Sequence, residues 1–153
     1  MNERAVKHST FVIERNYNAS PERVFAAWSD ASTKARWFPK ADEFDFRVGG
    51  REINRGGPPG GAIYTFDACY QEIVQNNRIV YTYTLDMGET RTSVSVTTVE
   101  IRQADSGTQL IYTEQGAFFD GHDTPEQREH GTKYILDKLG DFLKTDDERY
   151  ERD

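Results

Sequence analysis

Alternating apolar and polar positions predict that most of this chain is β-structure. Residues 10–17 place Phe11, Ile13 and Tyr17 at positions of the same parity, which is typical of a strand with one buried face. From residue 42 to 117 the same kind of pattern continues between turn-forming residues. Within that region, strands are expected over residues 62–75, 78–86, 91–103 and 108–117. Ile79, Tyr81, Tyr83 and Leu85 should share one face of their strand.

Two helix starts are marked by a capping residue followed directly by proline. Ser20-Pro21 precedes an apolar face made of Val24, Phe25 and Trp28. A second short helix is expected over about residues 32–37, ending where proline 39 disfavours helical backbone in the preceding residue.

The last helix should begin at Thr124-Pro125, with Gln127 at the third helical position. Its apolar residues follow helical spacing and form one stripe: Ile135, Leu136, Leu139, Phe142 and Leu143. The charged tail after residue 144 has little to bury and is expected to fray.

The strand over 91–103 has an irregular pattern. Val94 and Val96 have even parity, whereas Val99 and Ile101 have odd parity. Either a β-bulge near residues 97–98 brings all four to one face, or the strand is buried on both sides. In the second case a partner covers the outer face, and a homodimer is one such partner.

Glycines mark two further connections. The 105–107 turn should let Gly107 take the positive φ that a tight hairpin needs. The glycine-rich stretch 55–61 runs into a strand and lacks the Gly-Lys-Ser/Thr sequence of a phosphate-binding loop. It is expected to be a flexible connection, with a flap near a cavity mouth as the functional alternative.

Composition narrows the class of protein. Leu, Ile, Val and Phe together supply only about a fifth of the 153 residues, near the level where disorder becomes an alternative. An aromatic content of 12% argues instead for a thin, aromatic-rich core. With strands in one block and helices toward the ends, we predict one α+β domain over residues 1–153, with its folded core at about 10–144. A long helix across a curved sheet should leave a cleft, and such clefts commonly hold small molecules.

The chain resembles the START-like helix-grip superfamily, also called SRPBCC, and is similar to homologues of the activator of the heat-shock-protein-90 ATPase. The segments that carry this resemblance are NASPERVFAAW (18–28), WFP (37–39), FRVGGR (46–51), YTF (64–66), RIVYTY (78–83) and the final helix containing Gly131. The resemblance implies a β-α-α-β-β-β-β-β-β-α topology with a cavity between the sheet and the last helix. Members bind lipids, hormones or polyketides, and a few are cyclases or aromatases. Thr132 departs from the tryptophan that the family often carries there, which should enlarge the cavity.

Combining the resemblance with strand parity gives a set of candidate cavity residues: Trp28, Phe46, Phe66, Tyr81, Tyr83, Tyr112, Glu114, Phe118, Thr132 and Leu136. Glu114 would act as an acid or as a ligand anchor if its face meets the cleft. The alternative is a solvent-facing glutamate paired across strands with a residue such as Arg102. The three tyrosines equally suit a core that is short of leucine.

Metal, cofactor and disulfide chemistry are not indicated. Glu126 and His130 have a metal-compatible spacing, but two ligands are too few, and both are expected to be surface groups near an exposed helix start. Cys69 is the only cysteine and is expected to be a buried, inert thiol. No cofactor is expected.

The favoured function is a protein that binds a small hydrophobic or aromatic ligand in the cavity. A cyclase- or hydrolase-like enzyme using Glu114 and tyrosines is the second hypothesis, and a co-chaperone of the heat-shock-protein-90 ATPase is the third. A net charge of −7 argues against nucleic acid and anionic membrane surfaces as partners. With no apolar signal-peptide core at the N-terminus, the expected location is the cytoplasm.

Overall fold

Seven strands form a single antiparallel sheet, and three helices complete the fold within residues 4–152, which the computed structural model describes. Side chains are described for residues 4–145. The strands are β1 (Val6–Tyr17), β2 (Glu43–Phe44), β3 (Arg51–Gly56), β4 (Tyr64–Val74), β5 (Arg78–Met87), β6 (Thr90–Ala104) and β7 (Gly107–Phe119). The helices are α1 (Pro21–Ser29), α2 (Ala31–Lys34) and α3 (Pro125–Arg152).

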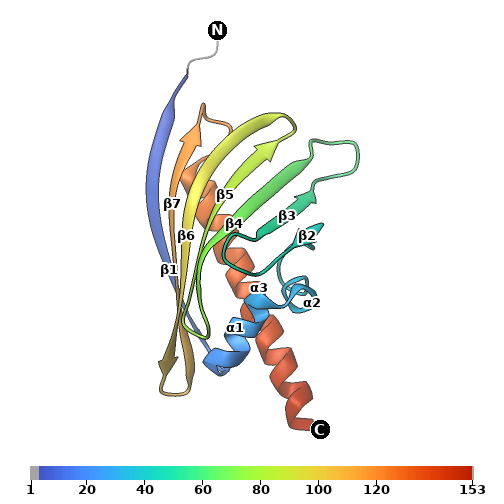
Figure 1. Ribbon diagram of the computed structural model, residues 1–153, viewed down its shortest axis with the longest axis vertical. Coiled ribbons are helices and arrows are strands. Elements are labelled where there is room, and N and C mark those ends of the chain that lie inside the picture. The colour runs from blue at the N-terminus through green and yellow to red at the C-terminus, as the bar shows by residue number, and fades with distance from the viewer. Residues whose placement is uncertain (1–3, 153) are drawn as a thin grey trace.

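The strand order across the sheet is β1-β7-β6-β5-β4-β3-β2, so β1 and β2 form opposite edges. The α1–α2 segment therefore carries the chain from one edge to the other. The sheet is curved, and α3 lies across one of its faces (Figure 1). This arrangement confirms the predicted α+β helix-grip fold and places a covered inner face between the sheet and the helices.

Both proline-marked helix starts are confirmed. The Ser20 hydroxyl accepts a hydrogen bond from the Arg23 amide at 3.2 Å, and the Thr124 hydroxyl accepts one from the Gln127 amide at 3.1 Å. These contacts satisfy amides that have no partner inside the helix.

Two helix boundaries differ from those expected. The second helix is shorter, spanning residues 31–34, because the Asp30 carboxylate caps the Thr33 amide at 3.0 Å and starts the helix earlier. Turns replace the helix over residues 35–37. The last helix continues to Arg152, through the charged tail that follows residue 144. Side chains from 146 onward lie outside the described residues, so fraying of the charged tail stays a prediction.

The inner face of the sheet carries the core, with the parity that the sequence predicts. Ile79, Tyr81 and Tyr83 are buried on β5, and Leu136 and Leu139 of α3 pack into the same apolar cluster. The polar inner-face positions cluster on β6, where Ser93, Ser95 and Thr97 are also buried. This polar part of the inner face becomes important at the site.

Of the two alternatives for the strand over 91–103, the bulge near residues 97–98 is wrong. Strand β6 keeps its register with β7 from Ser93 to Ala104, and the irregularity in its pairing with β5 falls at Thr92 instead. Val99 and Ile101 therefore face inward, whereas Val94 and Val96 face outward with 39% and 38% of their surface exposed. The parity change marks the place where the inner face turns from apolar to polar.

Gly107 is required for a reason other than the expected positive φ. Within the described residues, the glycines with positive φ are Gly49, Gly57, Gly60, Gly88 and Gly121. At Gly107 an added Cβ would instead clash with the backbone carbonyl oxygen of Tyr17 and crowd the backbone of Asn18 and Ala19. The hairpin turn thus packs directly on the end of β1.

Gly107→Ala should therefore lower the free energy of unfolding by about 1–3 kcal/mol, as overpacking of a tight site does. Gly131→Ala is the matched control, since a Cβ there meets nothing within 4 Å and glycine weakens a helix interior. The control should gain about 0.5–1 kcal/mol. Urea unfolding followed by circular dichroism measures both, and a neutral Gly107→Ala would contradict the close approach.

Candidate functional site

A cavity of about 440 Å³ lies on the inner face of the sheet, beneath α3. Arg55, Gly56, Gly57 and Gln127 are exposed and line it where it meets solvent. The rest of the wall is mainly aromatic and aliphatic: Trp28, Trp37, Phe38, Pro39, Tyr64, Phe66, Tyr81, Tyr83, Leu85, Tyr112, Ile135 and Leu136. The remaining lining residues are Asn54, Asp123, Arg128, Gly131 and Thr132.

Most of the candidates from the sequence line this cavity, and three lie elsewhere. Trp28, Phe66, Tyr81, Tyr83, Tyr112, Thr132 and Leu136 are part of its wall. Phe46 packs against Phe25 and Tyr70 with ring centroids 5.8 and 4.9 Å apart, outside the cavity. Phe118 and Glu114 are buried behind Arg128, which separates them from the open space.

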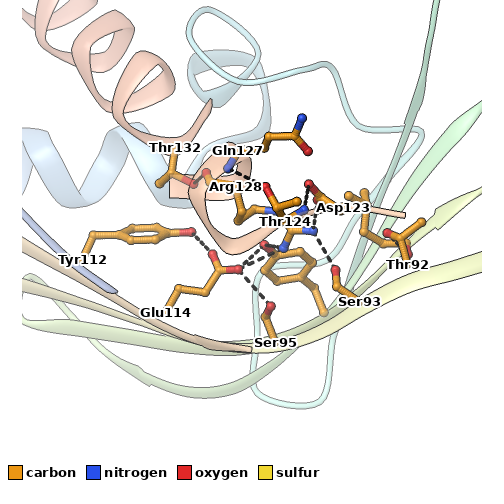
Figure 2. Close-up of polar contacts among 12 residues, drawn as sticks. Thr92, Ser93, Ser95, Tyr112, Glu114, Asp123, Thr124, Gln127, Arg128 and Thr132 are labelled. Carbon is orange, nitrogen blue, oxygen red and sulfur yellow. Dashed lines mark hydrogen bonds and ion pairs between the residues drawn. The ribbon is translucent and has the colours of Figure 1, made fainter. Parts of the chain in front are cut away.

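Glu114 is the centre of a buried polar cluster rather than a surface residue. Its Oε2 atom accepts hydrogen bonds from the hydroxyls of Tyr83 at 2.7 Å and Ser95 at 2.9 Å, and its Oε1 atom accepts one from Tyr112 at 3.0 Å (Figure 2). Only 1% of its surface is exposed. The solvent-facing alternative is therefore wrong.

The expected cross-strand partner of Glu114 is engaged elsewhere. The Arg102 guanidinium pairs with Glu100 on the outer face of the sheet, at 2.9 Å. Glu114 points inward from β7 and Arg102 points outward from β6, so the two side chains lie on opposite faces of the sheet.

Arg128, in the first turns of α3, closes the cluster from the helix side. Its Nη1 donates to the Tyr83 hydroxyl at 2.6 Å and to Glu114 at 3.0 Å, and its Nη2 donates to Ser93 at 2.6 Å and Asp123 at 2.8 Å (Figure 2). The guanidinium also lies over the rings of Tyr83 and Phe118, 5.5 and 5.0 Å from their centroids. One arginine therefore joins the sheet to the helix at the polar end of the cavity.

Sequence reasoning missed Arg128 and Asp123, although one signal was available. A cation near a helix N-terminus opposes the helix dipole, so an arginine at this place needs a compensating partner. The partner on α3's own side is Asp123, just before the helix, which also accepts a hydrogen bond from the Thr124 amide at 2.8 Å. The second partner, Glu114, comes from the sheet.

The cluster fixes the charge states of its members. Burial by itself lowers the pKa of Arg128, but neighbouring Tyr83, Glu114 and Asp123 outweigh it, so the pKa of Arg128 is raised. Burial raises the pKa of the Tyr83 and Tyr112 hydroxyls, and the Glu114 charge adds to both shifts. The arginine is therefore cationic and both tyrosines are neutral at pH 7.

A second buried charge pair lies behind the opposite wall of the cavity, and sequence reasoning missed it entirely. The Lys34 ammonium on α2 contacts Glu52 on β3 at 2.6 Å, and the Tyr70 hydroxyl donates to the same carboxylate oxygen. Lys34 and Glu52 are 4% and 1% exposed. Burial lowers the pKa of Lys34, and the Glu52 charge opposes that shift.

Aromatic rings surround this ammonium. It lies 4.6 Å from the Phe38 ring centroid, 5.5 Å from that of Trp28 and 6.0 Å from that of Tyr81. All three rings line the cavity, so the pair supports the wall without itself lining it.

Two polar atoms of wall residues lack hydrogen-bond partners among the described residues. They are the Trp28 indole nitrogen and the Asn54 carboxamide oxygen, and both are covered by their neighbours. The Asn54 amide nitrogen donates to the Pro39 carbonyl at 2.6 Å, which fixes the orientation of that amide.

Other candidate chemistry takes no part in the cavity. His122 and His130 are exposed, and within residues 4–145 no three His, Cys, Asp or Glu side chains are grouped to hold a metal ion. Cys69 lies on the outer parity of β4 and is partly exposed, so its expected burial is wrong. Among the described residues, no helix is both long enough and apolar enough to span a membrane.

Comparison with known proteins assigns the chain to a family and supports its fold. The family model for Activator of Hsp90 ATPase homolog 1-like proteins matches residues 18–144. No curated protein matches the chain.

Solved structures similar to this chain are numerous. An uncharacterized protein from Rhizobium leguminosarum is 41% identical, with a TM-score of 0.87, 94% of this chain covered and 99% of that one. The Mll3558 protein from Rhizobium loti is 46% identical, with a TM-score of 0.86 and coverage of 90% and 99%. DynU16, from the dynemicin biosynthetic locus, is 16% identical with a TM-score of 0.68, covering 89% of this chain and 47% of its own, and shares the fold alone.

Proposed function

Because this chain belongs to the family of Activator of Hsp90 ATPase homolog 1-like proteins, we propose that it binds a small apolar or aromatic molecule in the cavity beneath α3. The observation that carries the proposal is the cavity itself. Its volume of about 440 Å³ falls within the roughly 300–1,000 Å³ typical of ligand pockets.

The composition of the wall supports an apolar ligand. Aromatic rings come from the sheet, from α1 and from the segment after α2. Asn54, Arg55 and Thr132 add polar groups to the wall, and Asp123, Gln127 and Arg128 form a polar end near the start of α3. Pockets for small molecules combine an apolar wall with a few placed polar groups in this way. An amphipathic ligand would lie with its apolar body against the rings and its polar head toward that end.

The role of Glu114 follows from its position. It does not line the cavity, and its oxygens are held by Tyr83, Ser95, Tyr112 and Arg128. We therefore propose it as a positioning residue that sets the Arg128 guanidinium and the Tyr83 hydroxyl, and not as an acid that touches ligand. This makes a binding protein the favoured reading over a cyclase or hydrolase.

Thr132→Trp should weaken binding of an apolar probe. Thr132 is 8% exposed and lines the cavity from α3, so a larger side chain there fills the space. Titration with the neutral fluorophore N-phenyl-1-naphthylamine should show saturable fluorescence enhancement with the parent. In the variant the affinity should be at least about ten-fold lower, a difference of about 1.4 kcal/mol.

Tyr134→Trp is the matched control, because it also adds an indole to α3 but at a side chain that is 63% exposed. The control should bind the probe as the parent does. Equal binding by folded parent and Thr132→Trp would place the probe elsewhere and contradict the proposal, as would a parent that binds no probe.

A further inference from the structure

We propose that the cavity selects ligands whose polar head donates hydrogen bonds, namely a hydroxyl, an amine or an ammonium, and rejects carboxylates of the same shape. This selectivity rests on the proposed function and adds the chemical class of the ligand. It is carried by the polar end of the cavity, where the Arg128 terminal nitrogens and the Tyr83 hydroxyl donate to the protein and negative charge is in excess.

The terminal nitrogens of Arg128, the lining group best suited to bind an anion, already have partners in the protein. A guanidinium has four N–H groups on its two terminal nitrogens. In Arg128 these nitrogens make four hydrogen bonds, to Tyr83, Glu114, Ser93 and Asp123. A ligand carboxylate would have to displace one of these partners, two of which carry the charge that compensates the arginine.

The Tyr83 hydroxyl, which also lines the cavity, is similarly engaged. It donates to Glu114 at 2.7 Å and accepts from Arg128 at 2.6 Å. Two lining side chains at this end keep capacity for a ligand: the exposed Gln127 carboxamide, which can donate or accept, and the Asp123 carboxylate, which can only accept. Each of its oxygens accepts one hydrogen bond, from the Thr124 amide and from Arg128, and a carboxylate oxygen can accept two.

The local charge balance also favours a hydrogen-bond donor over an anion. Glu114 and Asp123 contribute two negative charges, and Arg128 contributes one positive charge. The other charged lining residue, Arg55, pairs with Asp42 at 3.0 Å and so adds no net charge. The α3 N-terminus supplies about half a positive charge, which reduces this excess but does not reverse it.

The aromatic wall tolerates a cationic head. Tyr83 and Tyr112 line the cavity beside Arg128, and the ring faces of tyrosine, tryptophan and phenylalanine attract cations. A carboxylate has no such compensation and would lose its hydration against these rings. An ammonium or hydroxyl can instead donate to Asp123.

Three naphthalene compounds that differ in the head group test the selectivity: 1-naphthylmethylamine, 1-naphthylmethanol and 1-naphthoate. Each is measured at pH 7 by displacement of N-phenyl-1-naphthylamine from the parent protein. The amine and the alcohol should displace the probe, and naphthoate should bind at least about ten-fold more weakly than either, or about 1.4 kcal/mol. Naphthoate binding as tightly as the alcohol would overturn the selectivity and leave the proposed function standing. If neither the probe nor any of the three compounds bound, the proposed function and the selectivity would both fall.

Asp123→Asn locates the source of the selectivity. The carboxamide oxygen can still accept from the Thr124 amide, but the charge facing the cavity is removed. Affinity for naphthoate should rise and affinity for the amine should fall, each by about three- to ten-fold, with the alcohol unchanged.

Asp141→Asn removes the same formal charge from an exposed position on α3 that does not line the cavity. It should leave all three affinities as they are, because exposed charges are screened by solvent and salt. Equal shifts in the two variants would show an effect of net charge alone and would overturn the assignment to Asp123.

Discussion

Lys34→Met should lower the free energy of unfolding by about 3–5 kcal/mol, because it leaves the Glu52 charge buried without a counter-charge. Glu52 is 1% exposed, and its Oε2 atom has no hydrogen-bond partner among the described residues even in the parent. In the variant only the Tyr70 hydroxyl would remain to compensate the carboxylate. Urea unfolding followed by circular dichroism measures the change in midpoint at constant slope.

The double variant Lys34→Met, Glu52→Gln separates charge from packing. Glutamine keeps an acceptor for Tyr70 and carries no charge, and methionine suits the surrounding rings of Phe38 and Trp28. Most of the lost stability should return. A single variant as stable as the parent would mean that Glu52 is not held as a buried charge, and a double variant as unstable as the single one would assign the loss to packing.

Leu139→Ala should cost about 2–5 kcal/mol of unfolding free energy, the usual range for deleting a fully buried leucine. Leu139 is fully buried in the apolar cluster where α3 meets the sheet. Residue 139 does not line the cavity, so probe binding measured under native conditions should persist while the denaturation midpoint falls.

Tyr134→Ala provides the comparison, since it removes a larger side chain from the same helix at a site that is 63% exposed. Its effect should stay within about 0.5 kcal/mol. If both variants lost the same stability, helix formation and not core packing would account for the result with Leu139.

Local rules account for what the sequence predicted well. Strand parity on β1 and β5 follows from a two-residue period, and both longer helices start where a capping hydroxyl precedes proline. The apolar stripe on α3 follows the spacing of a helix, and this local pattern placed Leu136 and Leu139 in the core. Each of these signals lies within a few residues of the feature that it predicts.

The cavity residues were predicted only in part, because parity identifies a face but not what covers each position on it. Tyr112 and Glu114 share the inner face of β7, yet Tyr112 lines the cavity and Glu114 lies behind Arg128. Phe46 was expected in the cavity from its aromatic character and packs against Phe25 and Tyr70 instead. The difference depends on where α1 and α3 cross the sheet.

The charged residues show most clearly what only the tertiary structure decided. Lys34 and Glu52 look like surface residues in the sequence, as do Asp123 and Arg128, since unpaired charges are almost never buried. Lys34 and Glu52 become buried, and Asp123 and Arg128 become partly buried, because the fold supplies partners of opposite charge: α2 meets β3 at Lys34, and α3 meets β7 at Arg128. The sequence by itself determined the elements, their inner faces and the family. Which charges enter the interior, and therefore what the cavity accepts, was decided by contacts between elements that no local pattern encodes, because burying a charge is favourable only once its partner is in place.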